Sequence, residues 1–214
     1  MLGIHDLALF IVSGLLLNMM PGPDSLLIML RSGSQGWRAG SVAALGIGTG
    51  TMVHVLAAAL GLSALLSTSA ELFTVIKLMG ALYLVYLGFS MFWQGAKTPS
   101  ATNAAVALPV LSYGRIFRQG LLTNVLNPKV ALFFLAFVPQ FIASDAPQKA
   151  LAFILLGCIF NLNGMIWCHL LAFSTAFSTA YASRRVSLPA RLGRWLNRLM
   201  GGLFVGLGIK LASE

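Results

Sequence analysis

The stretch that decides the fold is Leu15-Leu-Leu-Asn18-Met-Met-Pro21-Gly22-Pro23-Asp24-Ser25-Leu-Leu-Ile-Met-Leu30, where helix-breaking residues interrupt an apolar run. Pro21 and Pro23 remove backbone donors and Gly22 lets the chain turn, so a continuous helix is unfavourable here. Pro23 suits the first turn of a new helix, and Asp24 suits the positive end of its dipole. The stretch therefore predicts a helix that breaks and starts again.

A second stretch, Leu121-Leu-Thr-Asn124-Val-Leu-Asn127-Pro128-Lys129, has the same plan and is again followed by apolar residues. Pro128 supplies the break, and the charge beside it is basic rather than acidic. Asn18 and Asn124 lie one turn before their breaks, where an amide can satisfy backbone groups freed by proline. Contact with a substrate is the other interpretation, and it extends to Asn127.

The apolar runs around these breaks belong to a membrane protein. Hydrophobic residues make up 58% of the 214 positions and charged residues 9%, whereas soluble domains carry about 25% charged residues. Asp6 stands where a signal peptide would carry positive charge, so the first apolar run is expected to be retained. The charge-free tracts predict an all-α fold with six transmembrane helices at 4–20, 40–66, 70–94, 115–142, 149–177 and 195–213.

The basic residues indicate how the spans are oriented. Ten of the fourteen Lys and Arg residues fall in the connections on one side, so the positive-inside rule places both termini on the outer side. The net charge of +9 is therefore topological, and nucleic acid is not an expected partner. Arg31 and Arg38 are expected to be cytoplasmic anchors.

Three short matches recur in the same order in the two halves of the chain. The Asn18 and Asn124 segments form the first, His54-Val-Leu-Ala and His169-Leu-Leu-Ala the second, and Lys77-Leu-Met-Gly and Arg198-Leu-Met-Gly the third. Three spans per half make the second repeat inverted, an arrangement suited to alternating access. We expect a repeat at 1–94, a cytoplasmic linker at 95–114 and a second repeat at 115–214, each repeat with a broken first helix.

Asp24 and Lys129 are the main candidates for function. Asp24 either caps the second half-helix near the interface, or binds a substrate ammonium or the coupling proton. Lys129 either reaches the headgroups or binds a carboxylate, helped by backbone N–H groups at the half-helix N-terminus. A zwitterion needs both signs, although the pair could equally form a gate that the substrate opens.

Other polar or small residues within the spans have structural interpretations that compete with functional ones. His54 and His169 could relay protons, but an interhelical hydrogen bond is the simpler role. The Gly46-Ile-Gly48-Thr-Gly50 segment indicates close helix packing rather than a phosphate loop. Cys158 and Cys168 lack the spacing of a disulfide framework or a zinc site, and we expect buried free thiols.

Motifs of one family recur along the chain at Pro21-Gly22-Pro23-Asp24, Arg31, Gly40, Leu45–Gly48, His54, Leu78–Ala81 with Tyr83 and Leu84, Gly120–Lys129, Phe133-Phe134 and Pro139–Phe141. Together they resemble the lysine exporter and homoserine/threonine resistance family (LysE/RhtB). The resemblance covers nearly the whole chain and implies a six-span exporter of amino acids in the bacterial inner membrane, driven by the proton gradient. The chain has only five acidic residues and no acidic cluster for a basic side chain, which favours neutral substrates such as homoserine, threonine or branched-chain amino acids.

Two other functional classes remain open at this stage. A metal-ion carrier of related fold is the alternative, but only one deep acid is available as a hard ligand. A membrane enzyme would need a nucleophile with a base or a pair of acids, and neither pattern is visible. We therefore expect no catalytic residue, metal or cofactor, and the sequence leaves homo-oligomer formation open.

Overall fold

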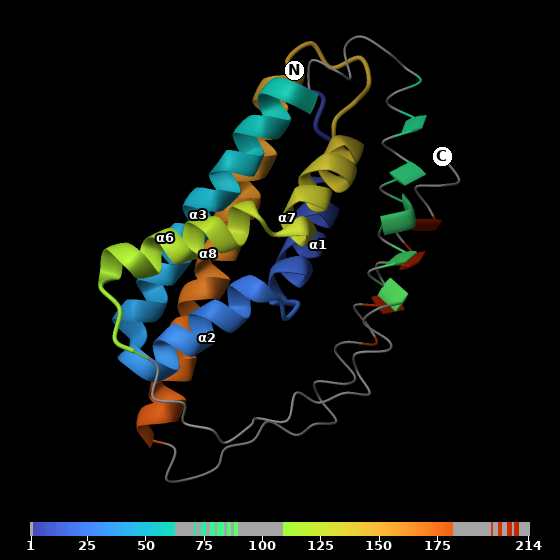
Figure 1. Cartoon of the computed structure of the whole chain (residues 1–214). Coiled ribbons are helices and arrows are strands. Elements are labelled where there is room, and N and C mark those ends of the chain that lie inside the picture. The colour runs from blue at the N-terminus through green and yellow to red at the C-terminus, as the bar shows by residue number, and fades with distance from the viewer. Residues whose placement is uncertain are drawn as a thin grey trace.

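A computed structural model describes residues 2–62 and 109–181, with scattered helical positions within 71–89 and 198–209. The described residues are helical apart from their connections and one isolated antiparallel bridge between Ile4 and Ile142. Figure 1 shows the labelled elements packed side by side as one bundle. The elements are α1 (Leu7–Met19), α2 (Pro23–Gln35), α3 (Trp37–Ala57), the π-helical η1 (Ala58–Leu62), α6 (Tyr113–Val125), α7 (Pro128–Leu132), the π-helical η2 (Phe133–Phe137), the 3-10 helix η3 (Val138–Phe141) and α8 (Lys149–Tyr181).

Both predicted helix breaks are confirmed. The axes of α1 and α2 differ by 54° across Pro21 and Gly22, and α6 differs by 47° from the helical segment that starts at Pro128. Pro23 and Pro128 each begin the second half-helix, where a missing N–H costs nothing. Each break thus lies at the helix-breaking residues that predicted it.

The described residues contain two helices long and apolar enough to cross a membrane, or up to four if each bent pair counts as one span. The two are Trp37–Gly61 and Lys149–Ala180, close to the predicted spans 40–66 and 149–177. The bent pairs correspond to the predictions 4–20 and 115–142, but the first continues through α2 to Gln35. The predicted spans 70–94 and 195–213, and most of the linker 95–114, lie outside the continuously described ranges.

The two broken helices lie antiparallel along their whole length. Near the chain start, His5 N donates to Phe141 O at 3.1 Å, and at the breaks Lys129 reaches the end of α1. At the other end, Gln35 exchanges hydrogen bonds of 2.9 and 3.0 Å with the backbone of Leu111. Thus α1 pairs with the segment α7–η3, and α2 pairs with α6. Two inverted repeats would give this pairing, and the repeat itself stays a prediction.

The backbones of α3 and α6 pack closely against each other, because small residues face each other there. A Cβ atom on Gly46 would collide with the Phe117 carbonyl oxygen, and one on Gly120 would collide with the Ala43 carbonyl oxygen. The expectation of close packing at the glycine-rich segment is therefore confirmed. This contact fixes α6, and with it Asn124, against α3.

We predict that Gly120→Ala lowers the stability of the folded protein. The added methyl group must push apart two backbones, and overpacking of this kind costs about 1–3 kcal/mol. The measurement is the apparent melting temperature of the detergent-solubilised protein. Gly114→Ala is the matched control on the same helix, because a Cβ there meets nothing within 4 Å. Equal melting temperatures for both variants would contradict the close-packing account.

Large apolar side chains cover the outside of the bundle, as a lipid-facing surface requires. Leu60 is 75% exposed and Leu162 is 63% exposed. The expectation of buried thiols is wrong for Cys158, which is exposed on this outer surface, whereas Cys168 is partly buried. Both are free. Helical periodicity places Cys158 on the outer face of α8. The tract around it is mainly apolar, so its sequence did not show which face of the helix points outwards.

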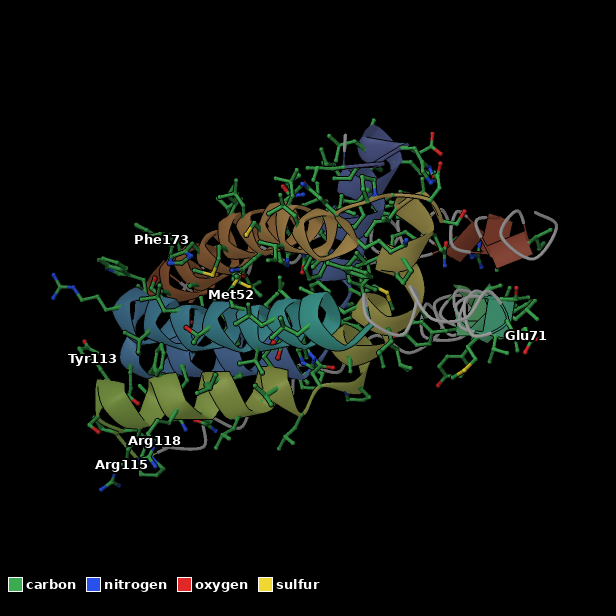
Figure 2. All side chains as sticks on the ribbon, turned by 90° about the horizontal axis from the view of Figure 1, so that it is seen from above. Met52, Glu71, Tyr113, Arg115, Arg118 and Phe173 are labelled. Atoms are coloured by element: carbon green, nitrogen blue, oxygen red, sulfur yellow. The ribbon has the colours of Figure 1, made fainter. Side chains whose placement is uncertain are left out.

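The basic residues of α6 gather at one end of the molecule. Figure 2 shows Arg115 and Arg118 at the opposite end from Glu71. Arg31, however, is not a surface anchor: it is 6% exposed and donates to Gln119 Oε1. The prediction of an anchoring role for Arg31 is wrong, because α2 continues past the break and places this residue inside the bundle against α6. Arg38 keeps a surface position, stacked over Trp37 with 5.5 Å between guanidinium and ring centre.

Candidate functional site

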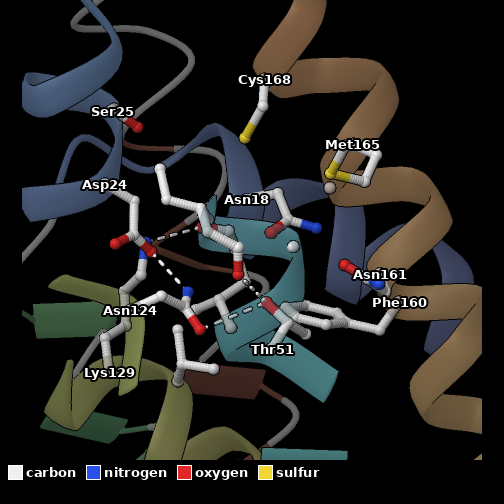
Figure 3. Close-up of a pocket in the computed structure, with 15 residues that line it drawn as sticks. Asn18, Asp24, Ser25, Thr51, Asn124, Lys129, Phe160, Asn161, Met165 and Cys168 are labelled. Atoms are coloured by element: carbon white, nitrogen blue, oxygen red, sulfur yellow. Dashed lines mark hydrogen bonds between the residues drawn. The ribbon is translucent and has the colours of Figure 1, made fainter. Parts of the chain in front are cut away.

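A pocket lies where the two helix breaks meet α3 and α8. Figure 3 shows side chains from α1, α2, α3, α6, α7 and α8 converging on it. The pocket is therefore built from both predicted repeats. Its lining residues are Leu17, Asn18, Asp24, Ser25, Ile47, Gly48, Thr51, Asn124, Lys129, Val130, Phe160, Asn161, Gly164, Met165 and Cys168.

Asp24 enters the pocket from the first turn of α2 and is held by two amides. Its Oδ2 atom accepts hydrogen bonds from Asn124 Nδ2 at 2.9 Å and from Asn127 Nδ2 at 3.0 Å. Its Oδ1 atom is buried and has no hydrogen-bond partner among the described residues. Because a buried acceptor without a partner is costly, this oxygen is a candidate ligand atom.

Lys129 fills the first break instead of pairing with the acid. Its ammonium donates to Leu17 O at 3.1 Å and to Met20 O at 3.2 Å, two carbonyls at the C-terminal end of α1, of which Leu17 O also accepts from Met20 N at 3.2 Å. Lys129 and Asp24 line the same pocket but form no salt bridge with each other. Each charge lies at a helix terminus of opposite polarity, the cation at the C-terminus of α1 and the anion at the N-terminus of α2.

The two asparagines of the second break make hydrogen bonds that position Asp24 and the start of α7. Asn127 caps α7, because its Oδ1 accepts from Lys129 N at 3.0 Å while its amide nitrogen holds Asp24. Asn124 lies between α2 and α3: its Oδ1 accepts from Thr51 Oγ1 at 3.3 Å and its amide nitrogen donates to Asp24. These contacts fix the Asp24 carboxylate without neutralising it.

Asn18 does not take the backbone groups freed by the first break, because Lys129 takes two of them. Its Nδ2 atom is buried and has no hydrogen-bond partner in the described part of the chain, and its side chain lines the pocket beside Gly164. Of the two interpretations of Asn18, contact with a ligand therefore has the better geometry. One amide nitrogen and one carboxylate oxygen, neither with a hydrogen-bond partner among the described residues, thus border one cavity.

The two histidines make contacts with backbone carbonyl groups. His54 Nε2 lies 3.1 Å from Asn124 O, and its ring stacks on Phe134 with 6.3 Å between centres. His169 Nδ1 lies 2.8 Å from Met165 O on its own helix. The interhelical hydrogen bond expected of both histidines is present at His54, but the expectation is wrong for His169, whose described partner lies one turn earlier on α8. A proton relay through either ring stays a prediction.

Sequence reasoning missed the pocket wall that α8 provides. Phe160, Asn161, Met165 and Cys168 face the two breaks from this helix. Polar residues inside the tract 150–183 were the available signal, since Asn161 interrupts an otherwise apolar run. Among the described residues, no group of three or more His, Cys, Asp or Glu side chains could hold a metal ion.

Comparison with known proteins places the chain among membrane proteins of similar length. It is 34% identical to an uncharacterized membrane protein of Pseudomonas aeruginosa over 215 aligned positions, covering 99% of this chain and 97% of the relative. It is 30% identical to a leucine efflux protein of Salmonella typhimurium over 174 positions, 81% of each chain. An uncharacterized membrane protein of Bacillus subtilis is 36% identical over 169 positions, 76% of this chain and 80% of the relative.

The comparison with solved structures found no match to this chain. The family model described as LysE type translocator matches residues 15–214, which include both helix breaks and all of the pocket. The resemblance seen in the motifs is thereby confirmed. The chain is a multi-pass membrane protein and belongs to the LysE type translocator family.

Proposed function

We propose that this protein is a secondary transporter that exports neutral amino acids from the cytoplasm across the bacterial inner membrane, with both termini in the periplasm. The observation that carries the proposal is the pocket at the two helix breaks, where Asp24 Oδ1 and Asn18 Nδ2 have no partner in the described part of the chain. Membership of a translocator family and the similarity to a leucine efflux protein support it.

The pocket contains complementary groups for a zwitterion. Asp24 Oδ1 would accept from the substrate ammonium, while Asn18 Nδ2 would donate to the substrate carboxylate. Lys129 has three donors, and two of them bind carbonyl groups at the end of α1, so the third can assist the carboxylate. The pocket can therefore bind both charged ends of an amino acid although Asp24 and Lys129 do not pair with each other.

The remaining wall has an apolar part, which indicates the substrate side chain. Ile47, Phe160 and Met165 form this apolar part, the polar side chains of Ser25, Thr51 and Asn161 lie beside them, and Asp24 is the only acid among the lining residues. A second cationic group on the substrate would therefore lose its hydration without gaining a partner. The geometry favours a neutral, branched or short side chain, as in leucine or threonine.

We expect Met165→Ala to shift substrate preference towards larger side chains. Removing the thioether widens the apolar wall, and a change of about one methylene in such a pocket alters selectivity roughly tenfold. The measurement is competition by phenylalanine against leucine in vesicle uptake. Leu162→Ala on the exposed face of the same helix is the control. Identical competition profiles for the two variants would remove Met165 from the substrate wall.

Asp24 also provides a route to proton coupling. A proton and a substrate ammonium would compete for the same Oδ1 atom, so binding of one favours release of the other. If the two broken helices rock against each other, this competition gives antiport of protons and amino acids. The same site would then serve binding and coupling, without an enzymatic step, a metal or a cofactor.

The decisive experiment is counterflow in proteoliposomes across a panel of single amino acids, with and without an imposed pH gradient. Neutral amino acids should exchange, and the pH gradient should drive their accumulation. Growth of an expressing strain on inhibitory amino acids and on divalent metals provides the second arm. Protection against metals alone, together with no counterflow of any amino acid, would replace the proposal with a cation carrier. Cross-linking of the purified protein would show whether it works as a homo-oligomer.

A further inference from the structure

The guanidinium of Arg31 lies inside the bundle and has an unusual partner. The residue is 6% exposed, and its Nε and Nη2 atoms donate to the single Oε1 atom of Gln119 at 3.2 and 2.9 Å. Its Nη1 atom is buried and has no hydrogen-bond partner in the described ranges. A permanent cation is therefore held by a neutral amide oxygen and is incompletely satisfied.

None of the acids in the described part of the chain neutralises this charge. Asp24 is bound by two asparagines, Asp6 lies beside His5, and Glu71 and Asp145 are exposed. Buried arginines normally pair with an anion, because a lone charge in low dielectric is expensive. The amide oxygen of Gln119 occupies the place that a carboxylate oxygen would take in a paired arrangement.

The position of Arg31 connects it to the pocket. Residues 24 and 31 are seven positions apart on α2, so they lie on one face and about 10 Å apart along the axis. Both side chains contact α6, Asp24 through Asn124 and Arg31 through Gln119. The α2–α6 contact thus has an acid at the pocket end and a cation two turns away, towards the end of α6 that carries Arg115 and Arg118 (Figure 2).

We propose that Arg31 is a second binding site, specific for the carboxylate of the amino-acid substrate, and that Gln119 holds it until substrate arrives. A carboxylate makes stronger hydrogen bonds to a guanidinium than an amide does, so it displaces Gln119 and separates α2 from α6 at this point. The substrate then passes to Asp24 and Asn18. This inference rests on the proposed export of amino acids and adds an entry step to it.

Substitutions of the two contact residues, Arg31 and Gln119, should change the KM in opposite directions. Arg31→Gln should raise the apparent KM for leucine about tenfold, because a charge-assisted carboxylate contact is lost. Gln119→Ala should lower that KM, because the competing amide is gone. Gln119→Glu should lower the maximal rate, because a permanent carboxylate occupies the guanidinium. If the contact only holds α2 against α6, both Arg31→Gln and Gln119→Ala should impair transport.

The experiment measures uptake of L-leucine and of L-leucinamide, which lacks the carboxylate, into inside-out membrane vesicles. The wild type should prefer leucine, and Arg31→Gln should reduce this preference about tenfold while Arg31→Lys retains part of it. Ser34→Ala on the exposed side of α2 is the control. Protein abundance in the vesicles is measured for every variant, and the two Gln119 variants keep the test valid if Arg31→Gln fails to fold.

Three outcomes would overturn the inference. The first is a parallel loss of leucine and leucinamide uptake in Arg31→Gln, which indicates a structural tie. The second is a raised KM in Gln119→Ala. The third is a wild type that moves neither probe, and this result contradicts the proposed function as well. The first two leave the wild-type leucine uptake intact, so they reject the Arg31 site alone.

Discussion

Asp24→Asn is expected to reduce amino-acid export roughly 10- to 100-fold, the range of one charge-assisted hydrogen bond to the substrate. Asparagine has the same shape, and its single amide oxygen can take the place of Oδ2 and accept from Asn124 and Asn127, so the pocket should keep its form while an amide nitrogen replaces Oδ1. It lacks the negative charge that attracts the ammonium, and it cannot exchange a proton. We therefore also expect a pH gradient to lose its effect on the remaining transport.

Initial rates in proteoliposomes between pH 6 and 8 would measure this effect, since they separate binding from coupling. Asp145→Asn is the matched control, because Asp145 is exposed and far from the helix breaks in sequence. Wild-type export by Asp24→Asn at every pH would show that the carboxylate only caps α2. A high rate that ignores the gradient would instead leave the coupling role in place and remove the binding role.

The breaks could be predicted from sequence because they depend on local chemistry. Proline and glycine decide the backbone at Pro21–Pro23 and at Pro128 whatever surrounds them. The same holds for the close packing of the Gly46–Gly50 segment, where a run of small residues has few other purposes. These features place two half-helix starts, and with them Asp24 and Lys129, in one region of the membrane.

The partners across the bundle could not be predicted, because they depend on which helix faces which. Arg31 follows the first apolar run like an anchoring residue, and only the path of α2 takes it inside to Gln119. The tract that forms α8 is mainly apolar with a few polar residues spread along it, so its sequence alone did not show that Asn161 and Met165 face the pocket. The sequence also left open whether Asp24 and Lys129 pair directly, and in the structure each binds partners at a helix terminus.

Lys129→Met should abolish most export by disrupting the first break rather than by removing a substrate contact alone. Methionine fills a similar volume but removes the ammonium donor from both carbonyls; Leu17 O keeps the bond from Met20 N, and Met20 O is left without a donor among the described residues. An unsatisfied buried carbonyl costs about 1–3 kcal/mol, so α1 and α2 should lose their fixed angle. Lys129→Arg keeps the donors and the charge, and it should retain part of the rate.

The readouts that separate these causes are export by vesicles and the apparent melting temperature of the purified protein. Lys149→Met is the control: Lys149 Nζ also donates to a carbonyl, that of Ala146 at 3.2 Å, but lies at the start of α8. Both the rate and the melting temperature should fall in Lys129→Met. A lost rate at an unchanged melting temperature would show that the break is stable without the ammonium, and Lys129 would then act on the substrate directly.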